Sequence, residues 1–241
     1  MILFFLFLSI EARIDSLENA FAQDRQIEIL VELSKCYLAT GEYRKSMELF
    51  KKNERHFVKD IDKARLLYES ATVFLFAGEI VKAHDTYLSL INRYAKFDIA
   101  NDAAERLYLI EAARDDTVQL KRLLNLVRLF ETAQFEAVAD SAKGMLKTAV
   151  GAYAYYYMAL TYNAMGNLPL ALGTLLELNK EYPEHRIFEA ILFQSDMYAS
   201  LDKKKEAREI LEDVIVREPN SIYALKARQR LKMLDENSGT N

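Results

Sequence analysis

The chain has 241 residues, of which 51% are hydrophobic and 28% are charged, a balance that allows a buried core. Seven Gly and three Pro are too few for the many turns of a strand-rich protein, so the composition favours a mostly helical fold. The net charge of −4 argues against a nucleic-acid partner, and the single cysteine, Cys36, excludes an internal disulfide framework.

The first eight residues, MILFFLFL, form an unbroken apolar run that is shorter than the roughly 20 residues a membrane-spanning helix needs. Its length suits the apolar region of a secretory signal, with cleavage after Ala12, which would leave no membrane span in the mature chain. No Lys or Arg precedes the run, and Ile10 is not the small residue expected two positions before the cut. The alternatives are a packed N-terminal helix or a misassigned start codon.

A set of landmark residues then recurs along the chain. In the first half, an aromatic residue, a glycine, a small residue and a large apolar residue return after 37 positions. In the second half, an aromatic residue, an alanine, a leucine and a proline return after 36 positions. The sets are Tyr37, Gly41, Ser46 and Phe50 with Phe74, Gly78, Ala83 and Tyr87, and Tyr162, Ala171, Leu175 and Pro183 with Tyr198, Ala207, Leu211 and Pro219. This order resembles the tetratricopeptide repeat (TPR), a helix–turn–helix unit of about 34 residues.

Helical physics agrees with that resemblance. Residues 203–217 place apolar side chains three and four positions apart, which makes one apolar stripe on a helix. Glycine at 41, 78 and 166 ends a helix, because glycine adopts the left-handed cap conformation without a Cβ penalty. The small residues are expected where two helices cross closely, and they are Ser46, Ala83, Ala171 and Ala207.

Five helix pairs are predicted from these landmarks. They are 27–40 with 43–57, 61–77 with 80–94, 117–132 with 135–148, 151–165 with 168–181, and 187–200 with 203–217. The third pair has Ala133 where the turn glycine should be. An extra helix at 101–114 fills the gap before it, and a bend or subdomain seam is expected near 97–117.

The C-terminal segment PNSIYALKARQRLKML predicts a final helix with Ser221 as its N-cap. Such a helix covers the last exposed core of a repeat array, and its basic residues are expected to face solvent. Those residues are Lys226, Arg228, Arg230 and Lys232. The segment resembles the last repeat and cap of bacterial envelope TPR proteins.

The resemblance implies an all-α fold, a right-handed α-solenoid of about five TPR units with one extra helix and a capping helix. The expected organisation is a signal peptide at 1–12, N-terminal TPR units at 13–97, an irregular extra helix at 98–116, C-terminal TPR units with the cap at 117–236, and a disordered tail at 237–241. A protein of this kind is expected to be a scaffold for protein–protein interaction.

Catalytic chemistry has no sequence signature in the chain. The histidines His56, His84 and His185 are scattered, and the usual metal-binding, phosphate-binding and nucleophile motifs do not occur. Cys36 has apolar helical neighbours, which favours a buried, inert thiol over a nucleophile. We therefore expect a protein that is not an enzyme and uses no metal or cofactor.

In the TPR family, the first helix of each pair lines a concave groove that holds a protein or peptide partner. Carried over by position, the groove residues are Glu28, Val31, Lys35, Leu38, Arg65, Tyr68, Thr72, Leu75, Tyr153, Tyr156, Leu160, Asn163, Glu189, Leu192, Asp196 and Ala199. Those expected to contact a partner are Lys35, Arg65, Tyr68, Thr72, Tyr153, Tyr156, Asn163 and Asp196. The Lys and Asn clamp of chaperone-binding members is absent at the matching positions.

The tyrosine-rich stretch at 152–166 is the most distinctive part of the expected groove. Tyr153 and Tyr156 are three residues apart and share the groove face, while Tyr155 and Tyr162 fall at packing positions. Tyrosine gives a large contact area with a polar tip, which suits peptide recognition. Packing between repeats is the alternative role of this stripe.

The sequence therefore predicts a non-enzymatic scaffold that binds a partner in its groove, in the periplasm or at the envelope of a bacterial cell. The alternative is an intracellular adaptor, or a fragment of a longer repeat array.

Overall fold

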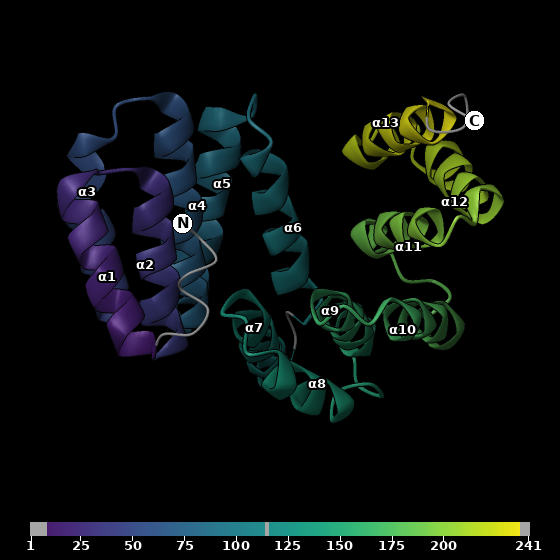
Figure 1. Ribbon diagram of the computed structural model, residues 1–241, viewed down its shortest axis with the longest axis horizontal. Helices are drawn as coiled ribbons and strands as arrows, with labels where there is room; N and C mark the ends of the chain where they lie inside the picture. The colour runs from purple at the N-terminus through teal and green to yellow at the C-terminus, as the bar shows by residue number, and fades with distance from the viewer. Residues whose placement is uncertain (1–8, 114–115, 237–241) are drawn as a thin grey trace. The chain divides into compact units, whose positions relative to one another are not determined.

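A computed structural model describes residues 9–113 and 116–236, which fold into thirteen α-helices and one short 3₁₀ helix, with no strand among them (Figure 1). The apolar run at 1–8 and the tail at 237–241 lie outside the described residues. The chain divides into two compact units between Gln134 and Phe135. The prediction of an all-α fold is confirmed.

Unit 1 holds the first seven α-helices. They are α1 (Ile10–Gln23), α2 (Ile27–Ala39), α3 (Tyr43–Asn53), α4 (Asp60–Phe76), α5 (Ile80–Tyr94), α6 (Ile99–Glu111) and α7 (Thr117–Glu131), with the 3₁₀ helix η2 (Glu54–His56) after α3. From α1 to α6, each helix packs against the next along the chain. Alternate helices also meet, α2 with α4 and α4 with α6, and α7 packs against both α2 and α4.

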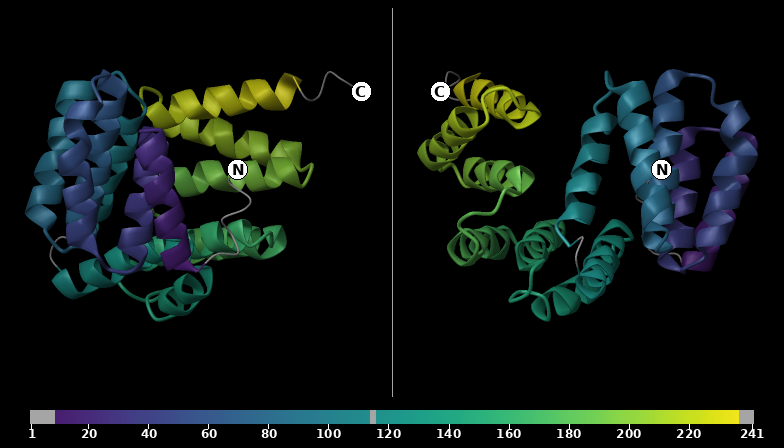
Figure 2. Two further views of the ribbon diagram at one scale, coloured as in Figure 1. Left: turned by 60° about the vertical axis from the view of Figure 1, so that its left-hand side comes forward. Right: turned by 180° about the vertical axis from the view of Figure 1, so that it is seen from behind.

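Unit 2 holds the remaining helices. They are α8 (Phe135–Lys143), α9 (Gly151–Ala164), α10 (Leu168–Glu181), α11 (Phe188–Ser200), α12 (Lys204–Arg217) and α13 (Ile222–Glu236). Each helix packs against the next, and α11 also meets α13. Within this unit, α9, α11 and α13 lie on one side of the stack, and α10 and α12 lie on the other (Figures 1 and 2). Stacked helix pairs of this kind are the repeating unit of an α-solenoid.

The structure places helices at all the predicted pairs, although α8 ends at Lys143 rather than 148. Helix α1 lies outside the five predicted pairs. It contains Ala12 in its first turn, and it packs on α2 through Leu17 and Phe21, four residues apart on one buried face. Helix α7 packs within unit 1, whereas the sequence grouped 117–132 with the C-terminal repeats. The spacing of apolar residues in α7 shows which face is buried but not which helices cover it. The unit to which α7 belongs is therefore decided by packing alone.

Five corners between helices share one backbone geometry. Gly41, Gly78 and Gly166 have φ of +76°, +82° and +78°, and a Cβ on any of them would meet no atom within 4 Å. Glycine is therefore needed there for its backbone freedom rather than for space. Ala133 and Asp202 adopt the same left-handed conformation, each with φ of 57°. The turn predicted at Ala133 is thus formed without a glycine.

The small landmark residues are fully buried, as their predicted place at helix crossings requires. Ala83, Ala171 and Ala207 have no exposed surface. Ser46 is equally buried, and its hydroxyl lies 2.6 Å from that of Ser34, so the α2–α3 crossing contains a satisfied polar pair. A buried hydroxyl without such a partner would be costly.

Candidate interaction surfaces

The groove residues predicted in unit 1 bind other parts of unit 1. Lys35 on α2 contacts Glu32 on the same helix, with 2.9 Å between Nζ and Oε1. Arg65 on α4 pairs with Glu28 on α2 at 3.3 Å. The Arg65–Glu28 contact joins α4 to α2 across the face that the sequence assigned to a partner.

The next two predicted residues are more deeply involved in packing. The Tyr68 hydroxyl accepts a hydrogen bond of 3.0 Å from Nε of Arg106 on α6, and burial raises the pKa of this tyrosine. Thr72 is only 1% exposed, and its hydroxyl lies 2.9 Å from that of Tyr87 on α5. Thr72 therefore belongs to the α4–α5 core rather than to a groove wall. Other positions carried over from the family are also core residues, namely Val31, Leu38, Leu75 and Leu192.

Helix α7 completes this network in unit 1. The Arg106 guanidinium that contacts Tyr68 also pairs with Glu131 at the end of α7. Nη1 of Arg128 donates to the carbonyl oxygen of Leu38 on α2 at 3.4 Å. Helix α7 thus packs against α2 and α4, two of the helices that were expected to line an open groove.

The predicted residues of unit 2 keep more solvent access. Tyr153, Tyr156 and Asn163 on α9 are each partly exposed. The ring of Tyr156 lies 5.5 Å from that of Tyr157, which is nearly buried, so this tyrosine packs along one edge and is accessible along another.

The two tyrosines expected to pack both contact the core of unit 2. Tyr155 and Tyr162 lie against a buried cluster formed by α9, α10 and α11. The ring of Tyr155 is 6.2 Å from that of Tyr182, whose hydroxyl donates to the Leu146 carbonyl oxygen at 2.6 Å. Tyr155 is only half-buried, so its packing role is weaker than a full core position would give.

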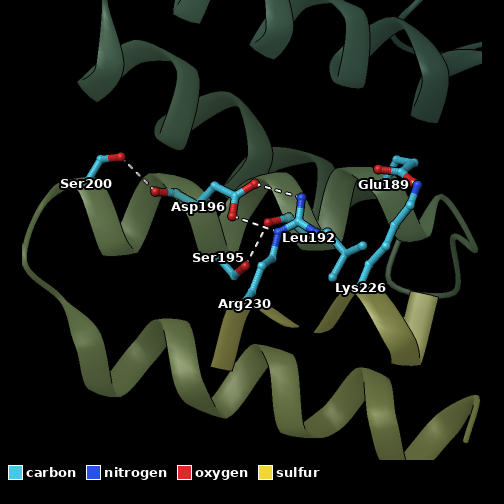
Figure 3. A network of polar contacts seen from close by, with 7 residues as sticks. All are labelled: Glu189, Leu192, Ser195, Asp196, Ser200, Lys226 and Arg230. Carbon is cyan, nitrogen blue, oxygen red and sulfur yellow. Dashed lines mark hydrogen bonds and ion pairs between the residues drawn. The ribbon is translucent and has the colours of Figure 1, made fainter. Parts of the chain in front are cut away.

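The clearest polar arrangement of unit 2 joins α11 to the final helix α13 (Figure 3). The Asp196 carboxylate accepts two hydrogen bonds from the Arg230 guanidinium, at 2.8 Å from Nε and 3.1 Å from Nη2. One end of α11 holds the second pair, Glu189 with Lys226. Lys226 and Arg230 were expected to face solvent, and that expectation is wrong, because both turn toward α11.

A sequence signal for these partners does exist. Glu189 and Lys226 are 37 positions apart, as are Glu28 and Arg65 in unit 1. In both units, an acidic residue near the start of one helix pairs with a basic residue two helices later, on α4 for α2 and on α13 for α11. A search for opposite charges one repeat apart would have found both pairs.

A cavity of about 250 Å³ lies beside the Asp196–Arg230 pair. Its lining is mixed, because the charged pair and two serines meet apolar side chains of α12 and α13. The lining residues are Ser195, Asp196, Ala199, Ser200, Leu211, Arg230, Met233 and Leu234. Met233 is 53% exposed, so the lining of this cavity includes an apolar side chain in contact with solvent.

Other chemistry has little support in the described part of the chain. No three His, Cys, Asp or Glu side chains gather there in a way that could hold a metal ion. Cys36 is buried, and burial raises the pKa of its thiol, which opposes formation of the nucleophilic thiolate. None of the helices described is both long and apolar enough to span a bilayer.

Comparison with known proteins agrees with the helix-pair geometry. Residues 153–185, which include most of α9 and all of α10, match the family model of the tetratricopeptide repeat. The chain contains a tetratricopeptide repeat. The TPR fold implies a scaffold for protein–protein interaction.

Several solved structures that align with this chain at low identity are TPR proteins. The TPR2AB domain of yeast Sti1, solved as a pHSP90 complex, is 13% identical over 93% of this chain and 90% of that chain, with a TM-score of 0.41. A tetratricopeptide repeat protein from Parabacteroides merdae is 13% identical over 93% of this chain and 92% of that chain, with a TM-score of 0.42. A search of curated proteins gives no match.

Proposed function

We propose that this TPR protein is a non-enzymatic scaffold that holds a peptide segment of a protein partner on unit 2, on the side formed by α9, α11 and α13. The observation that carries the proposal is the Asp196–Arg230 pair beside a cavity of about 250 Å³. The pair fixes two charged groups in one geometry before any partner arrives, and pre-organisation of this kind lowers the entropic cost of binding.

The paired groups keep capacity for further hydrogen bonds. Arg230 uses two of its five N–H donors on Asp196, and each Asp196 oxygen has a second lone pair. Peptide backbone offers N–H donors and carbonyl acceptors that match these groups. The neighbouring cavity, with Met233 at its side, suits an apolar side chain of the same peptide.

Helix α9 extends this surface with aromatic area. Tyr153, Tyr156 and Asn163 are partly exposed residues of α9, and this helix lies on the same side of the unit as α11 and α13 (Figure 1). Tyrosine is enriched among the residues that dominate binding energy at interfaces. We infer that the tyrosines supply area, while the charged pair of α11 and α13 sets the register of the peptide.

The test is capture of the partner from the native host by crosslinking and pull-down. The double variant Tyr153→Ala with Tyr156→Ala should lose most of the captured partner and keep its helical circular dichroism. Tyr155→Ala is the matched control, because the same ring is removed from the same helix at a position that packs toward Tyr182. Equal capture by the double variant and the wild-type chain would overturn the assignment of this surface.

We also propose that the partner belongs to a bacterial cell-envelope complex and that the chain is exported. The support is the apolar run at residues 1–8, which has the length of a signal core. Mass spectrometry of the protein from its native host tests this directly. Loss of the residues through Ala12 supports export, and an intact N-terminus in the cytoplasmic fraction contradicts it.

A further inference from the structure

Unit 1 contains an apolar groove on the opposite side of the helix stack from the predicted partner-binding residues. It lies between α3 and α5, with α4 as its floor, and has a volume of about 680 Å³. Its apolar lining is contributed by all three helices. Those residues are Met47, Phe50, Leu66, Leu67, Phe74 and Tyr94.

The shape of this groove follows from helical spacing. On α4, the lining residues Lys63, Leu66, Leu67, Ser70 and Phe74 are three or four positions apart, so they form one stripe along the helix. On α3, the lining residues Met47, Phe50 and Lys51 are spaced in the same way, and Glu54 and Arg55 of η2 continue the lining. The stripe on α4 runs from Lys63 to Phe74, eleven steps along the helix or about 16 Å. The groove is therefore elongated, with a length of about three helical turns.

The rim of the groove is basic. Four cationic side chains line it, Lys51, Arg55, Lys63 and Arg93, against the single carboxylate of Glu54. Within residues 9–113 and 116–236, no carboxylate lies within 4.0 Å of the charged nitrogens of Lys51, Arg55 or Arg93. This is a local excess of positive charge in a chain whose net charge is −4.

The equivalent groove of unit 2 has the opposite character. It lies between α10 and α12 over α11, has a volume of about 480 Å³, and is lined by the carboxylates of Glu206, Glu209 and Asp213. Arg217 lines the same groove and is bonded to Asp213. The basic rim is thus a property of the unit 1 sequence and does not come with the helix-pair fold.

From this geometry we propose that the groove between α3 and α5 binds an acidic amphipathic helix of a protein partner. The apolar floor accepts side chains spaced at i, i+3, i+4 and i+7, the pattern by which a helix docks into a groove. Asp and Glu on both flanks of that helix meet the cations of the rim, above all Lys51 and Arg55, because Lys63 already pairs with Asp60 and the Arg93 guanidinium lies over the Tyr94 ring. This site is on a different unit from the surface proposed above, so either can fail without the other.

A membrane surface with anionic lipids would also be attracted to the cations, and Val58 is exposed nearby in the chain. The groove favours a helix, because its apolar floor lies between α3 and α5, and a bilayer cannot enter a channel between two helices. Anionic vesicles therefore form one arm of the test.

The test uses the full chain and a fluorescein-labelled synthetic helix of about 14 residues, with Leu at i, i+3, i+4 and i+7 and Glu on both flanks. Fluorescence anisotropy should show saturable binding that weakens as NaCl rises from low to high concentration. The same peptide with Lys in place of Glu should bind at least about tenfold more weakly, because the rim repels it.

Two variants locate the site. Lys51→Glu with Arg55→Glu reverses two exposed charges and should weaken binding by about tenfold. Ser70→Trp places a large ring on the floor and should block the peptide. The matched control is Lys147→Glu with Lys232→Glu, which changes net charge equally on exposed lysines of unit 2 and should leave affinity unchanged.

Three outcomes overturn the proposal. They are equal binding of the Glu and Lys peptides, equal weakening by the rim and control variants, and binding to phosphatidylglycerol vesicles in the absence of binding to the Glu peptide. Thermal melting by circular dichroism checks each variant. If Ser70→Trp lowers the stability of unit 1, the charge-reversal pair, whose side chains are exposed, still decides the question.

Discussion

Asp196 on α11 and Arg230 on α13 are 34 positions apart in the chain and form an ion pair with two hydrogen bonds. The pair joins the last complete helix hairpin to the capping helix. Its side chains are 43% and 25% exposed, so water screens the attraction. A double-mutant cycle of Asp196→Ala and Arg230→Ala, measured by urea unfolding, should give a coupling free energy of about 0.5–1 kcal/mol. Strict additivity of the two changes would show that the pair contributes no stability.

Ala133 occupies a left-handed corner with φ of 57°, a place that Gly41, Gly78 and Gly166 take at other corners. An L-residue with a Cβ is strained in that conformation by about 1–2 kcal/mol, and part of this strain is offset because glycine is more flexible in the unfolded chain. Ala133→Gly should therefore raise the free energy of unfolding by about 0.5–1 kcal/mol in a denaturant titration. Asp202→Gly is the comparison. It should raise the free energy of unfolding by less, because aspartate tolerates the left-handed backbone conformation better than alanine does. A loss of stability in Ala133→Gly would contradict the backbone argument.

Ala83 and Ala171 are fully buried where the two helices of a pair cross. Leucine at either position has no room, so we expect Ala83→Leu and Ala171→Leu each to lower the free energy of unfolding by about 1–3 kcal/mol. Thermal melting gives the readout. Leucine at exposed Ala77 is a suitable control for hydrophobicity alone. Unchanged melting of both buried variants would mean that the crossings are looser than the packing indicates.

His185 follows the turn after α10 and takes part in a chain of hydrogen bonds. Its Nδ1 accepts from the Ile187 N–H at 3.3 Å, so in the neutral ring Nε2 carries the proton and donates to Oδ1 of Asn179 at 2.9 Å. Burial, and then the charge of Arg217, lower the pKa of His185 in the folded state.

The sign of the pH effect follows from that direction. A histidine whose pKa is lowered by folding takes up its proton more readily in the unfolded chain, so its contribution to stability is complete above the unfolded pKa of about 6.5 and is lost as pH falls below it. The urea concentration at the unfolding midpoint should decrease as the pH is lowered from 7.5 to 5. His185→Gln should make this decrease smaller. An equal pH dependence in wild type and variant would remove His185 as its source.

The helices themselves were largely predictable from the sequence, because local rules set them. Glycine at 41, 78 and 166 ends a helix through its backbone freedom, and alanine at 83, 171 and 207 permits a close crossing. Both properties belong to single residues, so their spacing in the sequence already gives the order and the corners of the helix pairs.

The partners of the polar side chains were not predictable in this way. Lys226 and Arg230 lie on an amphipathic helix and could face solvent or a neighbour, and their bonds to Glu189 and Asp196 exist only once α13 stacks on α11. In the same way, Arg106 meets Tyr68 and Glu131 only because α6 and α7 both pack beside α4. Helical periodicity determines which residues share a face of a helix. Which other helix covers that face depends on how segments distant in the chain pack, so the tertiary structure alone decides it.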